Sequence, residues 1–245
     1  MRGYYVGKLS GERLRRCYDV ASPRVKQYLE AEVRFVLSHL DRDDCVLELG
    51  CGYGRVTFRL AEVARRVVGI DTSPESLTMA RQIAGSGSRC EFLEMDAAEL
   101  TFDGSEFDTV VCVQNGICAF GIDQELLLQQ ALRVTRPGGR VLFSTYSKRF
   151  WTERLQWFET QAAAGLVGAI DYDKTANGTI VCKDGFHTGM VTPEGFRSLC
   201  KGLGVDPEVS EVDESSVFCE IVVPEEGMEH VTPRRSVASC GNRDG

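Results

Sequence analysis

The sequence predicts a doubly wound α/β domain with a mostly parallel sheet, and three observations carry that prediction. Short apolar runs alternate with helical patterns between residues 45 and 146. The runs are continuously apolar and rich in β-branched residues, as expected of parallel strands buried on both faces. A glycine-rich turn follows the first run, in the stretch VLELGCGYGRV at 46–56. Helices between buried strands imply right-handed crossovers and a helical layer on each side of the sheet.

Five predicted strands and the helices between them give the order of the domain. The first strand is followed by a helical pattern over 56–64. Pro74 then opens a second helix at its first turn. A third helix covers 123–135, and the turn RPGG at 136–139 leads into the last strand. The five predicted strands are 45–49, 66–71, 90–96, 107–113 and 140–146.

Further helices and strands are expected on both sides of this region. Residues 10–40 show a helical apolar side, and a Trp- and Phe-rich helix over 148–164 precedes the β-prone residues 167–191. Thr192-Pro193-Glu194 then marks the start of a helix that ends at about Leu203. The strands 208–212 and 217–224 close a domain that covers 45–224, and the polar residues 225–245 are expected to form a disordered tail.

Composition limits the class of protein. The net charge of -8 and the pI near 5.1 argue against the basic face that nucleic-acid binding requires. The ten cysteines include no CxxC pair and accompany three histidines, so we interpret them as free thiols in a reducing compartment. No signal-peptide core and no membrane-length apolar stretch is found. We expect a cytoplasmic protein that contacts neither membrane nor DNA, and we leave a homodimer open.

The glycine turn at Gly50, Gly52 and Gly54 lies where open parallel sheets bind ligands, outside the carboxyl ends of the strands. Glycine lets the backbone approach a ligand closely and exposes the amides of a helix N-terminus. A phosphate loop would need GxxxxGKS or GxxxxGKT, and a dinucleotide site would need a glycine where Arg55 stands. Taken alone, the GxGxG pattern is equally compatible with a tight turn that binds nothing.

Acidic residues around the turn favour a ligand. Glu48 lies inside the first strand, Asp71 ends the second and Asp96 ends the third. Asp71 can accept both hydroxyls of a ribose, and Asp96 can accept from an amino group such as that of adenine. Asp96 alone would also fit a helix or turn cap. Because carboxylates favour a cationic ligand over a pyrophosphate, the set indicates a positively charged nucleoside, a description that fits S-adenosylmethionine.

Five segments resemble the successive motifs of the class I S-adenosylmethionine-dependent methyltransferases. They cover about residues 45–147 and read VLELGCGYGRVTFRLA, VVGIDTSPESLTMAR, FLEMDAAEL, FDTVVCVQNGICAF and ALRVTRPGGRVLFSTYS. The resemblance implies a seven-stranded sheet whose last strand runs antiparallel, with the cofactor across its carboxyl edge. It also implies a helical lid over the site from residues 1–44 and a small insert after the fifth strand.

The resemblance further implies a role for each matching residue. Glu48 and the three glycines would shape the pocket for the methionine part of the cofactor. Asp71 would hold the ribose hydroxyls, and Thr72 would flank the adenine. The remaining residues would meet the adenine amine and ring (Asp96 and Ala97) or lie near the methionyl group and the reacting methyl (Gln114 and Asn115).

Residues on the acceptor side are less sharply defined. His187, in GFHTG, is the candidate general base because its unperturbed pKa lies near neutrality, although a lone histidine on a β-prone segment is more often structural. Tyr146 at the end of the fifth strand is the second catalytic candidate. No metal site is predicted. Other aromatic and sulfur-bearing residues fit either core packing or a role at the site: Tyr4, Tyr5, Tyr18, Trp151, Trp157, Phe158, Cys51, Cys112 and Cys118.

The sequence therefore predicts an enzyme that transfers a methyl group from S-adenosylmethionine to a small molecule. The loop VQNGI after the fourth strand departs from the Asp/Asn/Ser-Pro-Pro-aromatic pattern of enzymes that methylate the amino groups of adenine, cytosine or glutamine. Two alternatives stay open. One is a methyltransferase that acts on a protein or RNA, and the other is a non-catalytic cofactor-binding module with the same fold.

Overall fold

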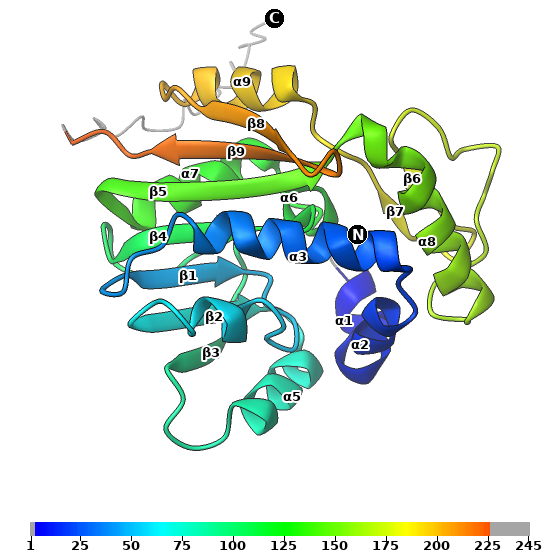
Figure 1. Ribbon diagram of the computed structural model, residues 1–245, viewed down its shortest axis with the longest axis horizontal. Coiled ribbons are helices and arrows are strands. Elements are labelled where there is room, and N and C mark those ends of the chain that lie inside the picture. Colours follow the sequence, from blue (N-terminus) through cyan, green and yellow to red (C-terminus); the bar gives the residue numbers. More distant parts are fainter. Residues whose placement is uncertain (1–2, 226–245) are drawn as a thin grey trace, which may run out of the picture.

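A seven-stranded sheet forms the centre of the computed structural model, which describes residues 3–225 (Figure 1). Its strands are β1 (Cys45–Leu49), β2 (Arg66–Asp71), β3 (Cys90–Glu94), β4 (Phe107–Cys112), β5 (Thr135–Tyr146), β8 (Glu208–Val212) and β9 (Ser216–Val222). They are ordered β3-β2-β1-β4-β5-β9-β8. Strands β1 to β5 pair in parallel, and β9 is antiparallel to both β5 and β8. The predicted sheet with one antiparallel strand is confirmed.

Helices cover both faces of this sheet because its central strands are apolar on both sides. In β1, Val46 packs with α3 (Pro23–Leu37) and α4 (Thr57–Leu60), whereas the adjacent Leu47 packs on the opposite face. That face is covered by α7 (Gln124–Val134) and α9 (Pro193–Gly202). Figure 1 shows α3 in front of the sheet and α7 behind it. The remaining flanking helix, α5 (Pro74–Ala84), packs against β3 through Leu77 and Phe92.

The N-terminal helices and the segment after β5 lie together at the end of the sheet toward which β1 and β5 point (Figure 1). The helices are α1 (Tyr4–Lys8) and α2 (Gly11–Asp19). We call residues 147–191 the insert; it contains η1 (Lys148–Phe150), α8 (Trp151–Ala163), β6 (Ile180–Val181) and β7 (His187–Thr188). Leu9 and Cys17 from the helices share an apolar cluster with Phe158 and Phe186 from the insert. The helical N-terminal region and the insert are therefore packed against each other.

Several predicted boundaries shift, each for a local reason. The helical stretch 10–40 divides before Pro23, where the Oγ of Ser22 accepts a hydrogen bond from the Val25 amide at 3.3 Å and caps a new helix. The turn 136–139 lies inside β5 instead of before it, and the pairing of β4 with β5 shifts register there. Tyr4 and Tyr5 belong to α1, which begins before the helical stretch predicted over 10–40.

The structure of residues 3–225 tests the expectations of free cysteines and of no membrane-spanning helix. All nine cysteines in this range are free. No helix in the range is both long and apolar enough to cross a membrane. Apart from residue 225, the tail predicted over 225–245 lies outside the described residues.

Candidate functional site

A cavity opens at the carboxyl ends of β1, β2, β3 and β4. The space between its walls is about 850 Å³, including the part open to solvent. The cavity also reaches α6 (Gly116–Ala119), which follows β4, and both N-terminal helices. Its lining residues are Tyr5, Tyr18, Gly50, Ile70, Asp71, Thr72, Met95, Asp96, Ala97, Val113, Gln114, Gly116, Ala119, Phe120 and Ile122.

The glycine turn forms one wall of the cavity and needs glycine at its first position. Gly50 has a φ of +74°, in the region that L side chains rarely adopt, and a Cβ there would lie 2.3 Å from Cζ of Phe120. The amides of Gly50 and Cys51 donate to the carbonyl of Ile70 at 2.8 and 2.9 Å, which ties the turn to β2. The backbone of the turn therefore borders the cavity, and the Phe120 ring packs directly against Gly50.

Asp71 joins the end of β2 to the glycine turn. Its Oδ2 accepts from the Gly52 amide at 2.8 Å, and its Oδ1 accepts from the Ser73 amide at 2.8 Å. Burial raises the pKa of Asp71, and the backbone hydrogen bonds oppose that shift. A carboxylate oxygen has two lone pairs, so each oxygen keeps acceptor capacity beside the cavity.

Glu48 lies beneath the turn in a smaller cavity that adjoins the first one. The Oγ1 of Thr57 donates to its Oε2 at 2.5 Å. Burial raises the pKa of Glu48 to about 7, against the lowering effects of Thr57 and Arg55. Arg55 lines the same small cavity, and its guanidinium lies 4.6 Å from the ring centroid of Tyr18. Glu48 therefore lies below the glycine turn, in the smaller cavity.

Gln114 stands at the end of β4 with an unusual backbone and an unpaired side-chain donor. Gln114 and Asn115 have φ values of +55° and +63°, which for non-glycine residues marks a conformation held by surrounding contacts. The Gln114 amide donates to Oε2 of Glu32 at 3.1 Å and to Oγ of Ser144 at 2.9 Å. Tyr18 donates to its side-chain oxygen at 3.2 Å. Its Nε2 is buried without a hydrogen-bond partner in the described chain.

Asn115 points away from the cavity and fixes the insert to the sheet. Its Nδ2 donates to Oγ1 of Thr188 at 2.9 Å and to the carbonyl of Gly189 at 3.1 Å. The Oγ1 of Thr145 donates to its Oδ1 at 2.7 Å. All of its principal bonding capacity is used inside the protein, so Asn115 positions the insert beside the end of β4.

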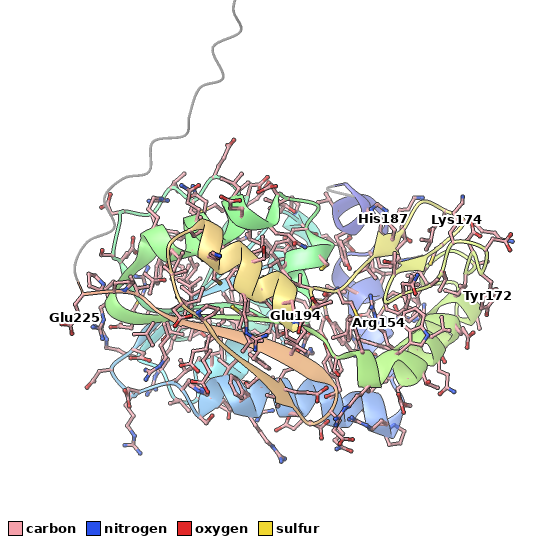
Figure 2. The ribbon with its side chains drawn as sticks, turned by 90° about the horizontal axis from the view of Figure 1, so that it is seen from above. Arg154, Tyr172, Lys174, His187, Glu194 and Glu225 are labelled. Atoms are coloured by element: carbon pink, nitrogen blue, oxygen red, sulfur yellow. The ribbon has the colours of Figure 1, made fainter. Side chains whose placement is uncertain are left out.

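The predicted site residues separate into those at the cavities and those elsewhere. His187 is exposed on β7 (Figure 2). Tyr146 is buried, with its ring centroid 4.1 Å from the guanidinium of Arg154. Neither lines the two cavities described above, and neither do Gly54 and Asn115. Their roles stay predictions. The predicted cofactor residues that line one of the two cavities are Glu48, Gly50, Gly52, Asp71, Thr72, Asp96, Ala97 and Gln114.

Some residues at the site were not predicted from the sequence. Ile70, Met95 and Val113 each stand directly before a predicted site residue at a strand end, a position that could have identified them. No local pattern identifies Phe120, because its ring is brought next to Gly50 only by the position of α6 in the fold. Glu32 could have been identified from the sequence. It is a charged residue on the apolar side of a predicted helix, four residues from both Tyr28 and Val36.

Comparisons with known proteins agree with this geometry. Residues 46–139 match the family model described as "Methyltransferase domain". The putative methyltransferase YqeM of Bacillus subtilis (strain 168) is 33% identical over 117 residues, covering 46% of this chain and 47% of that protein. The chloroplastic 2-phytyl-1,4-beta-naphthoquinone methyltransferase of Arabidopsis thaliana is 35% identical over 179 residues, covering 65% and 66%. The chain spans about half the length of the first of these relatives.

A solved structure shows the same fold. The N-methyltransferase NodS from Bradyrhizobium japonicum WM9, in complex with S-adenosyl-L-homocysteine, has a TM-score of 0.55 at 19% identity and covers 83% of this chain and 89% of its own. The strand order β3-β2-β1-β4-β5-β9-β8 and the family match over 46–139 agree with the glycine turn and the acids that follow it. Residues 46–139 form a methyltransferase domain, and the sheet has the fold of the class I S-adenosylmethionine-dependent methyltransferases.

Proposed function

We propose that this chain binds S-adenosylmethionine in the cavity at the carboxyl ends of β1 to β4 and transfers its methyl group to a small molecule. One observation carries the proposal: a half-buried carboxylate with free acceptor capacity and two unpaired buried donors lie around the glycine turn. Asp71 is the carboxylate, and the donors are Nη2 of Arg55 and Nε2 of Gln114.

The two ends of the site differ in the way that this cofactor requires. Toward the nucleoside end, Asp71 offers acceptors for ribose hydroxyls, and Ile70 and Met95 give apolar surface for a purine. Toward the amino-acid end, Arg55 and Gln114 supply donors whose lack of a partner would cost roughly 1–3 kcal/mol each if nothing bound them. A carboxylate would satisfy both donors. The residues present therefore fit the cofactor.

Methyl transfer requires the protein chiefly to position the acceptor against the methyl group. The cofactor supplies a methyl group on a sulfonium that leaves as a neutral thioether. Tyr5, Tyr18 and Phe120 enclose the cavity, so they would exclude water and align an acceptor, and alignment contributes roughly 7–11 kcal/mol at best. Burial raises the pKa of Tyr146 to about 12, so this residue stays neutral at pH 7 and is unsuited to act as a general base.

A small acceptor fits the site better than a macromolecule. The N-terminal helices cover part of the cavity through Tyr5 and Tyr18, which narrows the access of a large acceptor. The net charge of -8 is unfavourable for RNA. The Arabidopsis relative is named for a naphthoquinone, a small molecule.

The test measures binding of S-adenosyl-L-homocysteine and S-adenosylmethionine by isothermal titration calorimetry. In Asp71→Asn we expect affinity to fall about 10-fold to 100-fold, because hydrogen bonds to a charged group contribute roughly 1.5–3 kcal/mol. Glu91→Gln is the control. Glu91 lies on the edge strand β3, away from the cavity, and its carboxylate pairs with Arg66 of β2. Equal affinities in Asp71→Asn and the wild type would contradict the proposal. Binding without any labelled product from metabolite extracts would instead favour a non-catalytic module.

A further inference from the structure

Gln114 and Asn115 are consecutive left-handed residues in a place where no hairpin requires them. Their φ values are +55° and +63°. Among residues 3–225, the other such pair of non-glycine residues is Asp213-Glu214, which lies in the hairpin loop between β8 and β9, where positive φ is common. Gln114 and Asn115 instead lead from β4 into α6. Because left-handed backbone is unfavourable for L side chains, and least so for asparagine, surrounding contacts must hold Gln114 in this conformation.

The Asn115 side chain supplies such contacts. Asn115 is the N-cap residue of α6, a position where an asparagine usually accepts from an amide of the helix, yet its side chain makes no such bond. Instead its Nδ2 donates to Oγ1 of Thr188 at 2.9 Å and to the carbonyl of Gly189 at 3.1 Å. Its Oδ1 accepts from Oγ1 of Thr145 at 2.7 Å. The side chain thus joins the left-handed pair to β5 and to the end of the insert.

The end of the insert, residues 188–191, is itself fixed at this point. The amide of Val191 donates to Oγ1 of Thr145 at 3.1 Å. The carbonyl of Gly189 also accepts from Nη2 of Arg154 on α8 at 3.0 Å. The side chains of this network are buried, with at most 3% of their residues exposed: Asn115, Thr145 and Thr188. A buried network whose polar atoms are paired specifies one arrangement, because breaking a bond leaves a polar group unpaired away from water.

That arrangement keeps Gln114 at both cavities. Gln114 lines the two cavities, and its Nε2 is buried without a hydrogen-bond partner in residues 3–225. A change of φ at a residue redirects its side chain, so the Nε2 donor stays at the cavities only while the backbone remains left-handed. The bonds of Asn115 to the insert therefore bear directly on the donor that would meet the cofactor.

We infer that Asn115 is a positioning residue, through which residues 188–191 of the insert hold Gln114 in the conformation that binds the carboxylate of the cofactor. This inference rests on the proposed function, because it describes the control of that same site. Coupling between two sites is reciprocal, so the bound cofactor also holds residues 188–191 against the sheet.

Calorimetry with S-adenosyl-L-homocysteine tests the effect of the insert on the site. Asn115→Gly keeps a residue that adopts left-handed backbone without steric cost, and it removes the bonds to Thr188, Gly189 and Thr145. We expect its affinity to be at least 10-fold lower than that of the wild type. Asn177→Gly is the matched control: it makes the same exchange at an exposed asparagine of the insert with a φ of +50°, and it should bind like the wild type. An affinity of Asn115→Gly within twofold of the wild type would overturn the inference.

Amide hydrogen exchange tests the reverse effect and needs no variant to fold. In the wild type, S-adenosyl-L-homocysteine at about 100 times its Kd should slow exchange over residues 188–191 at least 10-fold, because the ligand binds the held state and opposes its opening. The amides of the β8–β9 hairpin loop are the internal control and should exchange at the same rate with and without ligand. In Asn115→Gly the slowing over residues 188–191 should disappear.

The outcomes separate the two proposals. Unchanged exchange over residues 188–191 in wild-type protein that calorimetry shows to be saturated would overturn the inference and leave the proposed function standing. Slowing of the same size in Asn115→Gly and in the wild type, each saturated with ligand, would also overturn it. Failure of the wild type to bind S-adenosyl-L-homocysteine would instead overturn the proposed function.

Discussion

Gly50 is the residue whose substitution should most directly damage the cofactor site. Alanine in a left-handed conformation costs roughly 1–2 kcal/mol, and here its Cβ would also lie 2.3 Å from Cζ of Phe120. Either the turn or the Phe120 ring must move, and both line the cavity. In Gly50→Ala we expect binding of S-adenosyl-L-homocysteine to weaken at least 10-fold, as measured by calorimetry.

A substitution at Gly85 separates the steric clash at Gly50 from the conformational cost of alanine at a positive φ. Gly85 has a φ of +64°, and a Cβ there would have no atom within 4 Å. Gly85→Ala should therefore lower the melting temperature without weakening binding. Adding Phe120→Ala to Gly50→Ala should restore part of the affinity, since it removes the clash and leaves the strain. No recovery in the double variant would show that backbone strain alone accounts for the loss.

Sequence reasoning identifies residues of this kind when their chemistry is local. Gly50 and Asp71 could be predicted because a turn and a strand end are defined by a few neighbouring residues. The burial of Arg154 could not be predicted, because it depends on residues far away in the sequence. An arginine on a predicted helix is expected to be exposed to solvent, whereas the fold buries Arg154 against Tyr146. The same limit applies to Phe120, whose contact with Gly50 spans two separate loops.

At the scale of elements, Glu32 links α3 to the sheet at the end of β4. Its Oε1 accepts from Oγ of Ser216 in β9 at 2.9 Å, and its Oε2 accepts from the Gln114 amide at 3.1 Å. Burial raises the pKa of Glu32 to about 7, although hydrogen bonds from Ser144 and Ser216 oppose that shift. A proton therefore binds more tightly in the folded than in the unfolded protein, for which the reference pKa is 4.5.

The stability from this group is present below pH 4.5 and is lost as pH rises through about 7. A shift from 4.5 to about 7 corresponds to about 3 kcal/mol in the free energy of unfolding. Glu32→Gln mimics the protonated acid, so the decrease in unfolding free energy between pH 5 and pH 8 should be smaller by about that amount in the variant. Urea unfolding at the two pH values measures it.

The control for that measurement lies two residues earlier on the same helix. Glu30 pairs with Arg59 at 2.9 Å, and the hydrogen bond from Arg59 lowers its pKa. Its contribution therefore changes at acidic pH, below the window from pH 5 to pH 8. Glu30→Gln should leave the slope in this window unaltered. If Glu32→Gln and Glu30→Gln gave the same slope, the buried carboxyl would not be its source.

At the scale of the whole molecule, the sheet was predictable and the docking of the insert was not. Each parallel strand is a continuous apolar run, so its existence and its place between helices follow from local sequence. The insert has β-prone residues over 167–191 but forms strands of two residues each, β6 and β7, because it packs mainly through side chains onto α1 and α2. That packing joins segments more than a hundred residues apart and has no local pattern.

Tyr4 and Arg13 donate two of the hydrogen bonds that fasten the N-terminal helices to the insert. The hydroxyl of Tyr4 donates to Oδ2 of Asp184 at 2.6 Å, and Nε of Arg13 donates to the carbonyl of Leu166 at 3.0 Å. The clusters that hold the sheet include neither α1 nor α2, so these helices can open while the sheet stays folded. A hydrogen bond to a charged group contributes roughly 1.5–3 kcal/mol, so removing such contacts should raise the open population about 10-fold or more.

Tyr4→Phe combined with Arg13→Ala should therefore speed tryptic cleavage within α2 about 10-fold, with little change in the melting temperature of the sheet. Limited proteolysis followed by mass spectrometry measures the rate at Arg15 and Arg16. Glu12→Gln is the control, because it breaks a pair with Arg15 inside α2 and leaves the insert contacts intact. Since Tyr5 and Tyr18 line the cavity, S-adenosyl-L-homocysteine should slow cleavage in both proteins. Equal cleavage rates in the double variant and the wild type would mean that the remaining contacts, among them the apolar cluster and the bond from Trp157 Nε1 to the Cys17 carbonyl, hold the helices closed.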